Sequence, residues 1–247
     1  MKLNTCLRGD SLQWMRTISK PFADLIVADP PFNIGFDYDS YNDDQPVNDY
    51  LDWSRQWIAE AKRLLHNEGN LLVCMGDEHV SDIDVICRQS LGLTRTNWIV
   101  WHYNFGQSGT LDTRKRFTRS KTHILRYVKN TKFYFNAEAV AVQSDRQKLY
   151  NDRRADPRGK CPDDVFNFKR IAGTHKSRVC GIKTQMPTEL LKIWIKAMCK
   201  PSGIVFDPFA GSGASLAAAK ELRYKYLGIE LSPQYHQVIL SRLSKIL

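Results

Sequence analysis

The sequence lacks the cysteine pattern of a disulfide-stapled or zinc-binding protein. Its six cysteines are scattered over 247 residues, and no two of them form a Cys-x-x-Cys pair. The six histidines do not stand beside them at ligand spacing. We therefore expect no metal site, and free thiols in a reducing cytoplasm.

Long apolar runs are also missing. No stretch approaches the roughly 18 residues that a membrane span needs, and the first five residues do not begin a signal peptide. Internal repeats, low-complexity segments and obvious linkers are absent as well. Hydrophobic residues make up 43% and charged residues 25%, which is typical of a globular protein with a real core. These features predict one domain over residues 1–247, with no membrane attachment.

Among the motifs present, Asp29-Pro30-Pro31-Phe32 is the most informative. It closes the apolar run 25–28, which predicts a buried parallel strand with Asp29 at its C-terminal edge. Because proline has no backbone N–H and a fixed φ, the two prolines end any helix or β-strand pairing and make the turn rigid. A planar amino-heterocycle could donate its amino hydrogens to the Asp29 carboxylate and the Pro30 carbonyl while stacking on Phe32. An ordinary Pro-Pro turn in which Asp29 caps the next segment would give the same tetrapeptide, so this motif alone leaves both interpretations open.

A second motif follows another predicted strand, residues 203–207. The turn Asp207-Pro208-Phe209-Ala210-Gly211-Ser212-Gly213 leads into a predicted helix over 214–222, and its glycines allow the backbone to approach a ligand closely. Glu230 stands nineteen positions after Gly211, at the end of a strand-like segment, where a carboxylate can accept both hydroxyls of a ribose. Position 216 is leucine, not the third glycine of a dinucleotide fingerprint, so a nucleoside without phosphates fits better than NAD.

Together the two motifs resemble those of the amino-methyltransferases of DNA that use S-adenosylmethionine. The catalytic-type motif precedes the cofactor-type motif, which is similar to the permuted β class of adenine-N6 methyltransferases, and the resemblance covers roughly residues 3–245. Further matches are 8–10, 164–168 and 184–187, with Met186 standing where the family often has lysine. The resemblance implies catalytic residues Asp29, Pro30, Pro31 and Phe32, and cofactor-binding residues Asp10, Asp29, Thr184, Gln185, Asp207, Phe209, Ala210, Gly211, Ser212, Gly213 and Glu230. For Asp10, a simple helix N-cap is an equally good interpretation.

The positive charge is concentrated in one block. The chain carries 36 Lys plus Arg and 26 Asp plus Glu, a net charge of +10, and residues 111–183 hold 19 and 7 of these, a net of +12. The remainder therefore has 17 and 19, a net of −2. A solvated charged face is the ordinary explanation of a charge run, but this asymmetry favours nucleic acid. The residues expected to contact DNA are Arg114, Lys115, Arg116, Arg119, Lys121, Arg153 and Arg154.

Apolar runs, glycine turns and helical periodicities alternate along the chain. They predict an α/β fold, a doubly wound Rossmann-like methyltransferase sheet of about seven mostly parallel strands, with residues 106–181 as a basic target-recognition insertion. Residues 123–128 and 132–136 are expected to form a hairpin at the sheet edge. Helical periodicity over 49–65 places an aromatic stripe that we expect in the core.

The resemblance implies an enzyme, a site-specific DNA methyltransferase that transfers methyl to the N6 amine of a flipped adenine. Cytosine-C5 methylation is disfavoured because no proline is followed by cysteine. The alternatives are N4-cytosine methylation, whose enzymes usually carry serine in place of Asp29, an RNA methyltransferase, and an inactive nucleic-acid-binding partner of the same fold. The expected partner is double-stranded DNA, and the protein is expected to be a cytoplasmic enzyme that is bacterial or phage-encoded. A homodimer and a companion restriction nuclease are left open, as is the recognition sequence.

Overall fold

A single eight-stranded sheet organises the chain. The computed structural model describes residues 2–103, 115, 117–173, 175, 177–179, 181–182 and 184–246. Within them the strand order is β1-β8-β7-β2-β3-β5-β4-β6. The strands are β1 (Thr5–Arg8), β2 (Ala23–Ala28), β3 (Leu65–Met75), β4 (Thr94–His102), β5 (Lys121–Val128), β6 (Val165–Asn167), β7 (Ile204–Asp207) and β8 (Lys225–Glu230). All neighbouring pairs run parallel except those made by β5, which confirms the predicted fold class with one strand more than expected.

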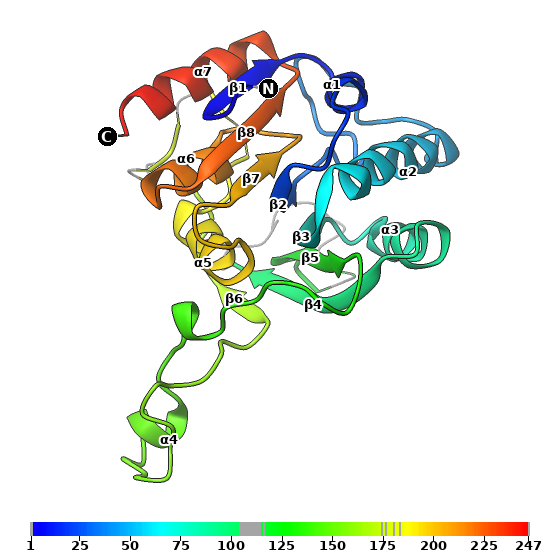
Figure 1. The fold of residues 1–247 in the computed structure, drawn as a ribbon. Coiled ribbons are helices and arrows are strands. Elements are labelled where there is room, and N and C mark those ends of the chain that lie inside the picture. Colours follow the sequence, from blue (N-terminus) through cyan, green and yellow to red (C-terminus); the bar gives the residue numbers. More distant parts are fainter. Residues whose placement is uncertain are drawn as a thin grey trace.

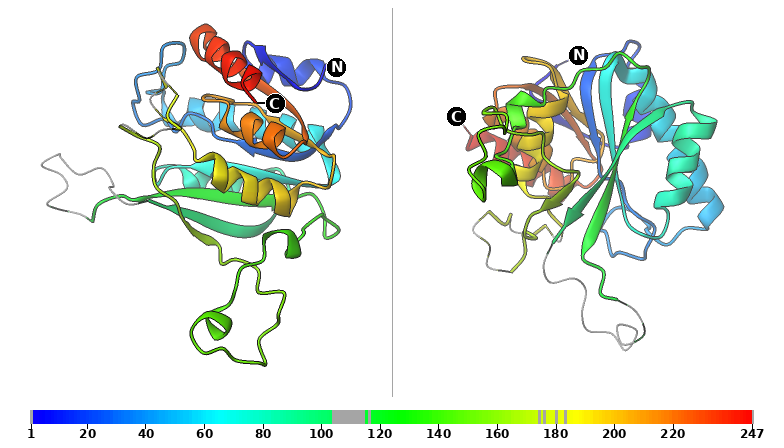
Figure 2. Two further views of the ribbon diagram at one scale, coloured as in Figure 1. Left: turned by 90° about the vertical axis from the view of Figure 1, so that its left-hand side faces the viewer. Right: turned by 90° about the horizontal axis from the view of Figure 1, so that it is seen from below.

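Helices cover both faces of the sheet (Figure 1). One layer contains α1 (Ser11–Thr17), α2 (Val47–Leu64), α3 (Val80–Val85) and the π-helical turn Ile86–Ser90, and the other contains α5 (Thr188–Met198), α6 (Ala214–Glu221) and α7 (Pro233–Ser244). In the right-hand view of Figure 2, seen from below, the sheet lies edge-on between these two layers. None of the helices that the structure describes is long and apolar enough to cross a bilayer.

The core fills both sides of the sheet. Along β2, Leu25 and Val27 pack into one buried cluster, and Ala23, Ile26 and Ala28 pack into the other. A strand buried on both faces is what a continuous apolar run predicts. The stripe of α2 also lies in the core, as expected, with Tyr50, Trp57, Ala61 and Leu64 fully buried.

The predicted edge hairpin is wrong. β5 lies between β3 and β4 and pairs antiparallel with both, whereas residues 132–136 form no strand. Instead, the Tyr134 and Asn136 amides donate to the carbonyls of Glu68 (2.9 Å) and Ala197 (2.8 Å). Ile124 and Leu125 pack into opposite core clusters, so β5 must be covered on both faces, and an internal position in the sheet satisfies this.

Most of the segment 137–164, between β5 and β6, extends away from the body of the molecule (Figure 1), although the turn at its start packs against α5. This segment contains the 3₁₀ turn Glu138–Val140 and the short helix α4 (Asp145–Lys148). β6, where the chain rejoins the sheet, is the edge strand beside β4.

Candidate active site

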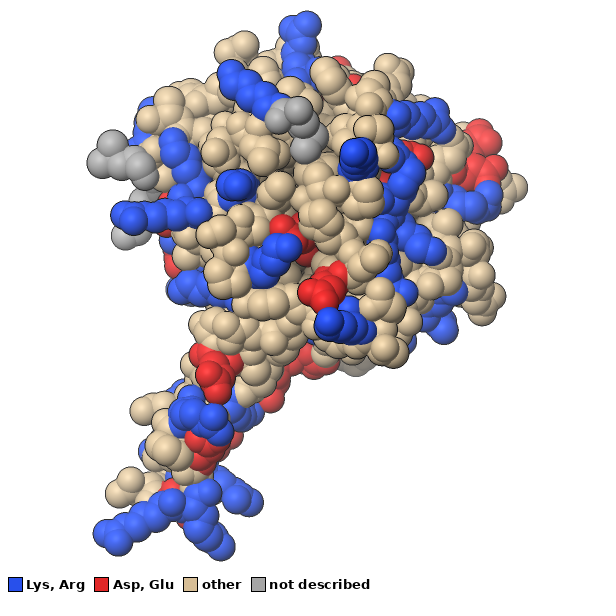
Figure 3. Space-filling view, viewed as in Figure 1, with Lys and Arg blue, Asp and Glu red and all other residues tan. Residues whose placement is uncertain are grey.

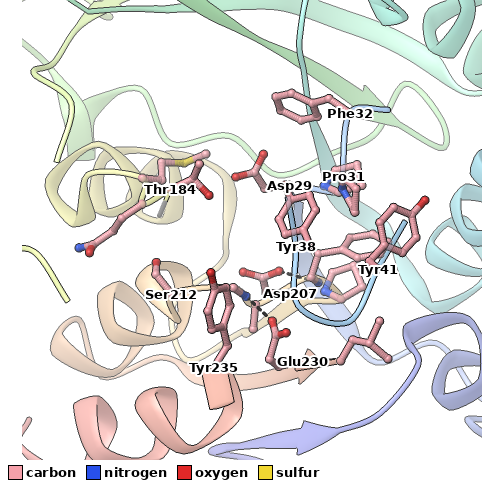
Figure 4. A pocket seen from close by; sticks show the side chains of 18 of the residues that line it. Asp29, Pro31, Phe32, Tyr38, Tyr41, Thr184, Asp207, Ser212, Glu230 and Tyr235 are labelled. Carbon is pink, nitrogen blue, oxygen red and sulfur yellow. Dashed lines mark hydrogen bonds between the residues drawn. The ribbon is translucent and has the colours of Figure 1, made fainter. Parts of the chain in front are cut away.

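The two motifs meet because their strands are neighbours. β2 and β7 pair in parallel through Leu25 with Val205 and Ile26 with Phe206. Their C-terminal ends therefore lie at the same edge of the sheet, and Asp29 and Asp207 emerge side by side (Figure 4). β8, on the other side of β7, brings Glu230 to the same edge. Parallel sheets commonly bind ligands at this position.

A cavity of about 350 Å³ opens between these strand ends. Its walls include almost every residue that the sequence predicted for the site: Asp10, Asp29, Pro30, Pro31, Phe32, Thr184, Gln185, Asp207, Phe209, Ala210, Gly211, Ser212 and Glu230. Gly213 is not in the wall but begins α6 with a φ of +67°, in the left-handed region that favours glycine. A Cβ there would also lie only 3.0 Å from the side chain of Ile239.

Asp29 has no hydrogen-bond or ion-pair partner among the described residues. Its side chain is reached by solvent through the cavity, yet protein surrounds it, and this burial raises the pKa of its carboxyl to about 7. The turn behind it is held by the Tyr50 hydroxyl, which donates to the Pro31 carbonyl at 2.9 Å. The Phe32 ring lies against Gly76, where a Cβ would come within 3.2 Å of it. The carboxylate is thus presented from a fixed frame and is free to accept hydrogen bonds from a ligand.

Two further carboxylates lie in the same wall without a cationic partner among the described residues. Asp207 accepts hydrogen bonds from the Phe209 amide (2.9 Å) and the Ser215 hydroxyl. Burial raises the pKa of Asp207 to about 7, with repulsion from Asp29 and Glu230 adding to it. Glu230 accepts from the amides of Gly211 (2.7 Å) and Ser232 (2.8 Å), and burial raises its pKa as well. Three uncompensated carboxylates make the cavity suited to a cationic ligand.

Two of the predicted cofactor-binding residues also form hydrogen bonds that stabilise the local structure. Asp10 caps α1, because its carboxylate accepts from the Gln13 amide at 2.8 Å, so the N-cap interpretation holds while the residue still borders the cavity. The Gln185 side chain accepts from the Val179 amide (3.0 Å) and donates to the Ser177 carbonyl (2.9 Å). It thereby ties the segment before α5 to the cavity wall.

The loop 33–46, which we did not predict from the sequence, forms another wall. Buried Asp43 organises it by accepting from the amides of Asn33 (2.8 Å), Ile34 (3.1 Å) and Phe36 (2.9 Å). Asp39 then contacts the Ser232 hydroxyl at 2.5 Å, which joins the loop to the start of α7. Tyr38 and Tyr41 face the cavity (Figure 4). The three aromatic residues at 36, 38 and 41, a few positions after the proline turn, were the sequence signal that could have indicated this wall.

A third wall comes from β4, β5 and the segment after β6, and it too was missed. Trp101, Tyr103, Thr122 and Arg170 border the cavity there. The Arg170 guanidinium lies over the Tyr103 ring, 5.3 Å from its centroid, and forms no ion pair within the described residues. These residues are far apart in sequence, and only the pairing of β4 with β5 and β6 brings them to one place.

The predicted DNA-binding cations have different surroundings. Arg114 and Arg116 lie outside the described residues, and Lys115 is exposed. Arg119 pairs with Glu78 and Asp77, and Lys121 pairs with Asp77 at 2.9 Å. Arg154 pairs with Asp152 at 2.9 Å, whereas Arg153 has no ion-pair partner in the described part of the chain. Part of the positive block is therefore neutralised by acidic residues, some of which lie outside it in sequence.

Comparison with known proteins agrees with this geometry. The model of a family described as DNA methylase, covering N6 and N4 enzymes, matches residues 23–241. DNA adenine methyltransferase YhdJ of Escherichia coli K12 is 33% identical over 97% of this chain and 82% of its own length. Type II methyltransferase M.HpaI of Haemophilus parainfluenzae is 30% identical over 95% of this chain and 72% of its own length.

Solved structures share the fold. The cytosine-N4-specific PvuII DNA methyltransferase superposes with a TM-score of 0.75 at 16% identity, covering 96% of this chain and 85% of that one. TTHA0409 from Thermus thermophilus, solved in complex with S-adenosylmethionine, superposes with a TM-score of 0.67 at 23% identity, covering 98% and 95%. With a family model matched over most of its length and a carboxylate-lined cavity at the ends of β2, β7 and β8, this chain belongs to the N6/N4 DNA methylase family.

Proposed function

We propose that this protein is a site-specific DNA methyltransferase that modifies the N6 amine of adenine. One observation carries the proposal: Asp29 lies unpaired on a rigid proline turn and faces a cavity beside two more carboxylates. The adenine methyltransferase YhdJ, 33% identical over nearly the whole chain, supports the same base. N4-cytosine methylation is the second candidate, since the PvuII enzyme shares the fold.

S-Adenosylmethionine is the methyl donor of this family, and the cavity fits it. Glu230 would accept hydrogen bonds from ribose hydroxyls, and the turn at Gly211, with a φ of +51°, allows the backbone to approach the nucleoside. The negative walls suit a positively charged sulfonium. When bound, the cofactor supplies an electrophilic methyl carbon.

Asp29 would prepare the target nitrogen for attack. The lone pair of an aromatic amine is delocalised into its ring, so the amine is a poor nucleophile. If the Asp29 carboxylate and the Pro30 carbonyl each accept one amino hydrogen, the nitrogen becomes more tetrahedral and its lone pair turns toward the cofactor side. The same acceptors stabilise the positive charge that develops on nitrogen, without any reorganisation of the site. A cation bound nearby lowers the pKa of Asp29 and keeps it charged for this role.

Because Asp29 faces into the cavity, the target base must leave the duplex to reach it. A methyltransferase cannot reach an amine within a stacked pair, so the target base is flipped into the pocket and held between flat surfaces. Phe32 offers one such surface on the Asp29 side of the cavity. The cations of the 111–183 block would bind backbone phosphates around it.

The test uses Asp29→Ala and Asp29→Asn with labelled S-adenosylmethionine and unmethylated genomic DNA. We expect Asp29→Ala to lose all detectable methyl transfer, and Asp29→Asn to lose about 10²-fold or more, the scale for removing one electrostatic stabiliser of a transition state. Cofactor binding, measured by calorimetry, should stay within a few-fold and serves as the control for folding. Hydrolysis of the wild-type product to nucleosides identifies the base. Label found in N4-methylcytosine would contradict the adenine assignment and support N4-cytosine methylation, the second candidate. Methyl transfer by Asp29→Ala would show that Asp29 has no part in the mechanism.

A further inference from the structure

The loop 33–46 forms a wall of the cavity, yet none of its side chains takes part in the chemistry proposed above. Its conformation is held at two places. Asp43 accepts hydrogen bonds from three backbone amides at the beginning of the loop. Further along, Asp39 contacts the Ser232 hydroxyl at 2.5 Å and so fastens the loop to the start of α7. The side chains between these two points are therefore held over the cavity.

Tyr38 is the side chain of this loop that stands among the reactive groups. It is half-buried and borders the cavity. In Figure 4 its ring stands between Asp29 and the carboxylates of Asp207 and Glu230, whereas Phe32 lies on the other side of Asp29. The two aromatic rings therefore face different parts of a bound ligand.

The electrostatic surroundings of Tyr38 agree with this position. Burial raises the pKa of Tyr38, and repulsion from Asp29, Asp43 and Tyr235 adds to the effect. Its hydroxyl thus lies within electrostatic range of the Asp29 carboxylate on one side and of α7 on the other. Because the pKa is raised, the phenol stays uncharged at neutral pH.

The sulfur of a bound cofactor belongs in the same interval. In the proposed arrangement the ribose binds Glu230, and the methyl group faces the amine held at Asp29. The sulfur joins these two parts of the cofactor, so it lies between the two carboxylates. Tyr38 stands in that interval (Figure 4).

An aromatic face in this place distinguishes a charged sulfur from a neutral one. The face of a phenol ring carries negative potential and attracts a cation such as a sulfonium. Methyl transfer breaks the S–CH₃ bond and leaves its electron pair on sulfur, while the new N–CH₃ bond forms and the amine releases a proton to water. The product, S-adenosylhomocysteine, is therefore a neutral thioether, and the ring attracts it less.

We propose that Tyr38 is a specificity-determining residue that makes the site prefer S-adenosylmethionine to S-adenosylhomocysteine, by laying its aromatic face against the sulfonium. The inference rests on the proposed use of the cavity, but not on which base is methylated. Its consequence is that the spent cofactor loses one attractive contact at the moment of transfer and leaves more readily.

Other charges of the molecule provide less of this preference. The chain has a net charge of +10, and Figure 3 shows Lys and Arg side chains spread over the face that it presents, with fewer Asp and Glu. A positive exterior does not favour the more positive ligand. Inside the cavity, Asp29 and Asp207 have a pKa of about 7, so each is partly protonated at neutral pH before the cofactor binds. The attraction of the ring needs no ionisation.

The test measures the dissociation constants of both ligands by calorimetry, without DNA, in three variants. Tyr38→Leu keeps apolar bulk but removes the ring, and Tyr38→Phe keeps the ring without its hydroxyl. Tyr41→Leu is the matched control, because Tyr41 borders the cavity from the same loop but packs against Trp53 of α2, with 5.7 Å between ring centroids. The ratio of the two constants is compared, since damage to a wall that both ligands share cancels in it.

We expect Tyr38→Leu to lower the preference for S-adenosylmethionine by about 2- to 30-fold, the range for a cation over an aromatic ring. Tyr38→Phe should keep the preference within roughly two-fold, because its ring also attracts cations. Tyr41→Leu should change both affinities together and leave the ratio unaltered. In methyl-transfer assays, Tyr38→Leu should become more sensitive to inhibition by S-adenosylhomocysteine by the same factor.

A second pair of variants tests the position of the ring without changing it. Asp39→Ala removes the partner of the Ser232 hydroxyl, so the loop should hold Tyr38 less firmly and the preference should fall. Asp39→Asn loses the same charge, but its carbonyl can still accept from Ser232, and it should keep the preference. Combining Asp39→Ala with Tyr38→Leu should lower the ratio little further than Tyr38→Leu alone, because both changes act through one contact.

An unchanged ratio in Tyr38→Leu would overturn the proposal, as would an equal fall in Tyr41→Leu. If Tyr38→Leu bound neither ligand, equal ratios for Asp39→Ala and Asp39→Asn would overturn it instead. Failure of the proposed function looks different. If wild type methylates adenine while the ratio does not depend on Tyr38, only the role of Tyr38 is excluded. If the ratio depends on Tyr38 while the label is found on cytosine, the role of Tyr38 stands and the assigned base falls.

Discussion

Replacing Asp207 by asparagine should stabilise the cofactor-free protein at neutral and alkaline pH. The Asp207 side chain is only 5% exposed and has no cationic partner within the described residues. Its hydrogen bonds come from the Phe209 amide and the Ser215 hydroxyl. Asparagine has the same shape and can keep both contacts, with its carbonyl accepting from Phe209 and its amide donating to Ser215. The substitution therefore removes mainly the buried charge.

The size of the effect follows from the pKa. Burial, with smaller repulsion from Asp29 and Glu230, raises the pKa of Asp207 from 3.8 to about 7. Between these two values the folded state binds more protons than the unfolded state, so the stability of the wild type falls as pH rises. Three units at about 1.4 kcal/mol each give a loss on the order of 4 kcal/mol, complete above about pH 7. Asparagine does not titrate. As the pH is raised through this window, the free energy of unfolding of the variant should therefore rise relative to that of the wild type by the same amount.

Urea unfolding of both proteins at several pH values measures the difference. Asp24→Asn is the matched control, because Asp24 is also buried but pairs with Lys200 at 3.0 Å and accepts from the Ile204 amide at 2.8 Å. That variant should lose stability at neutral pH, since it breaks an ion pair. If the free energies of Asp207→Asn and wild type ran parallel with pH, the idea that Asp207 carries an uncompensated charge would be refuted.

Two further substitutions test the walls of the cavity. Glu230→Ala should weaken S-adenosylmethionine binding by about 1–3 kcal/mol, the scale of charge-assisted hydrogen bonds, as measured by calorimetry, and unchanged affinity would place the ribose elsewhere. Asp43→Ala leaves three backbone amides of the loop 33–46 without their acceptor, so it should cost about 3 kcal/mol and speed hydrogen exchange in that loop. Unaltered exchange would show that Asp43 does not hold the loop.

The sequence by itself determined the parts of the site that are local. A continuous apolar run ending in Asp29 specifies a buried strand with a carboxylate at its end, and the glycines at 211 and 213 specify a turn, since both adopt positive φ. Glu230 stood at the end of its strand as expected. The predicted family and fold class are confirmed, because the two motifs are short, specific and fixed by local chemistry. The individual roles of these residues stay predictions.

Tertiary structure decided what depends on partners distant along the chain. β5 has a strand pattern, but which strands it pairs with is set by burial on both faces, not by its nearest neighbour in sequence. The charge of the 111–183 block could be counted, yet only the fold shows that Arg119 is paired with Glu78 while Arg153 has no such partner among the described residues. The wall formed by Tyr103 and Arg170 exists because β4 pairs with β5 and β6. Residue type and spacing fix local conformation, whereas long-range packing fixes which side chains share a surface.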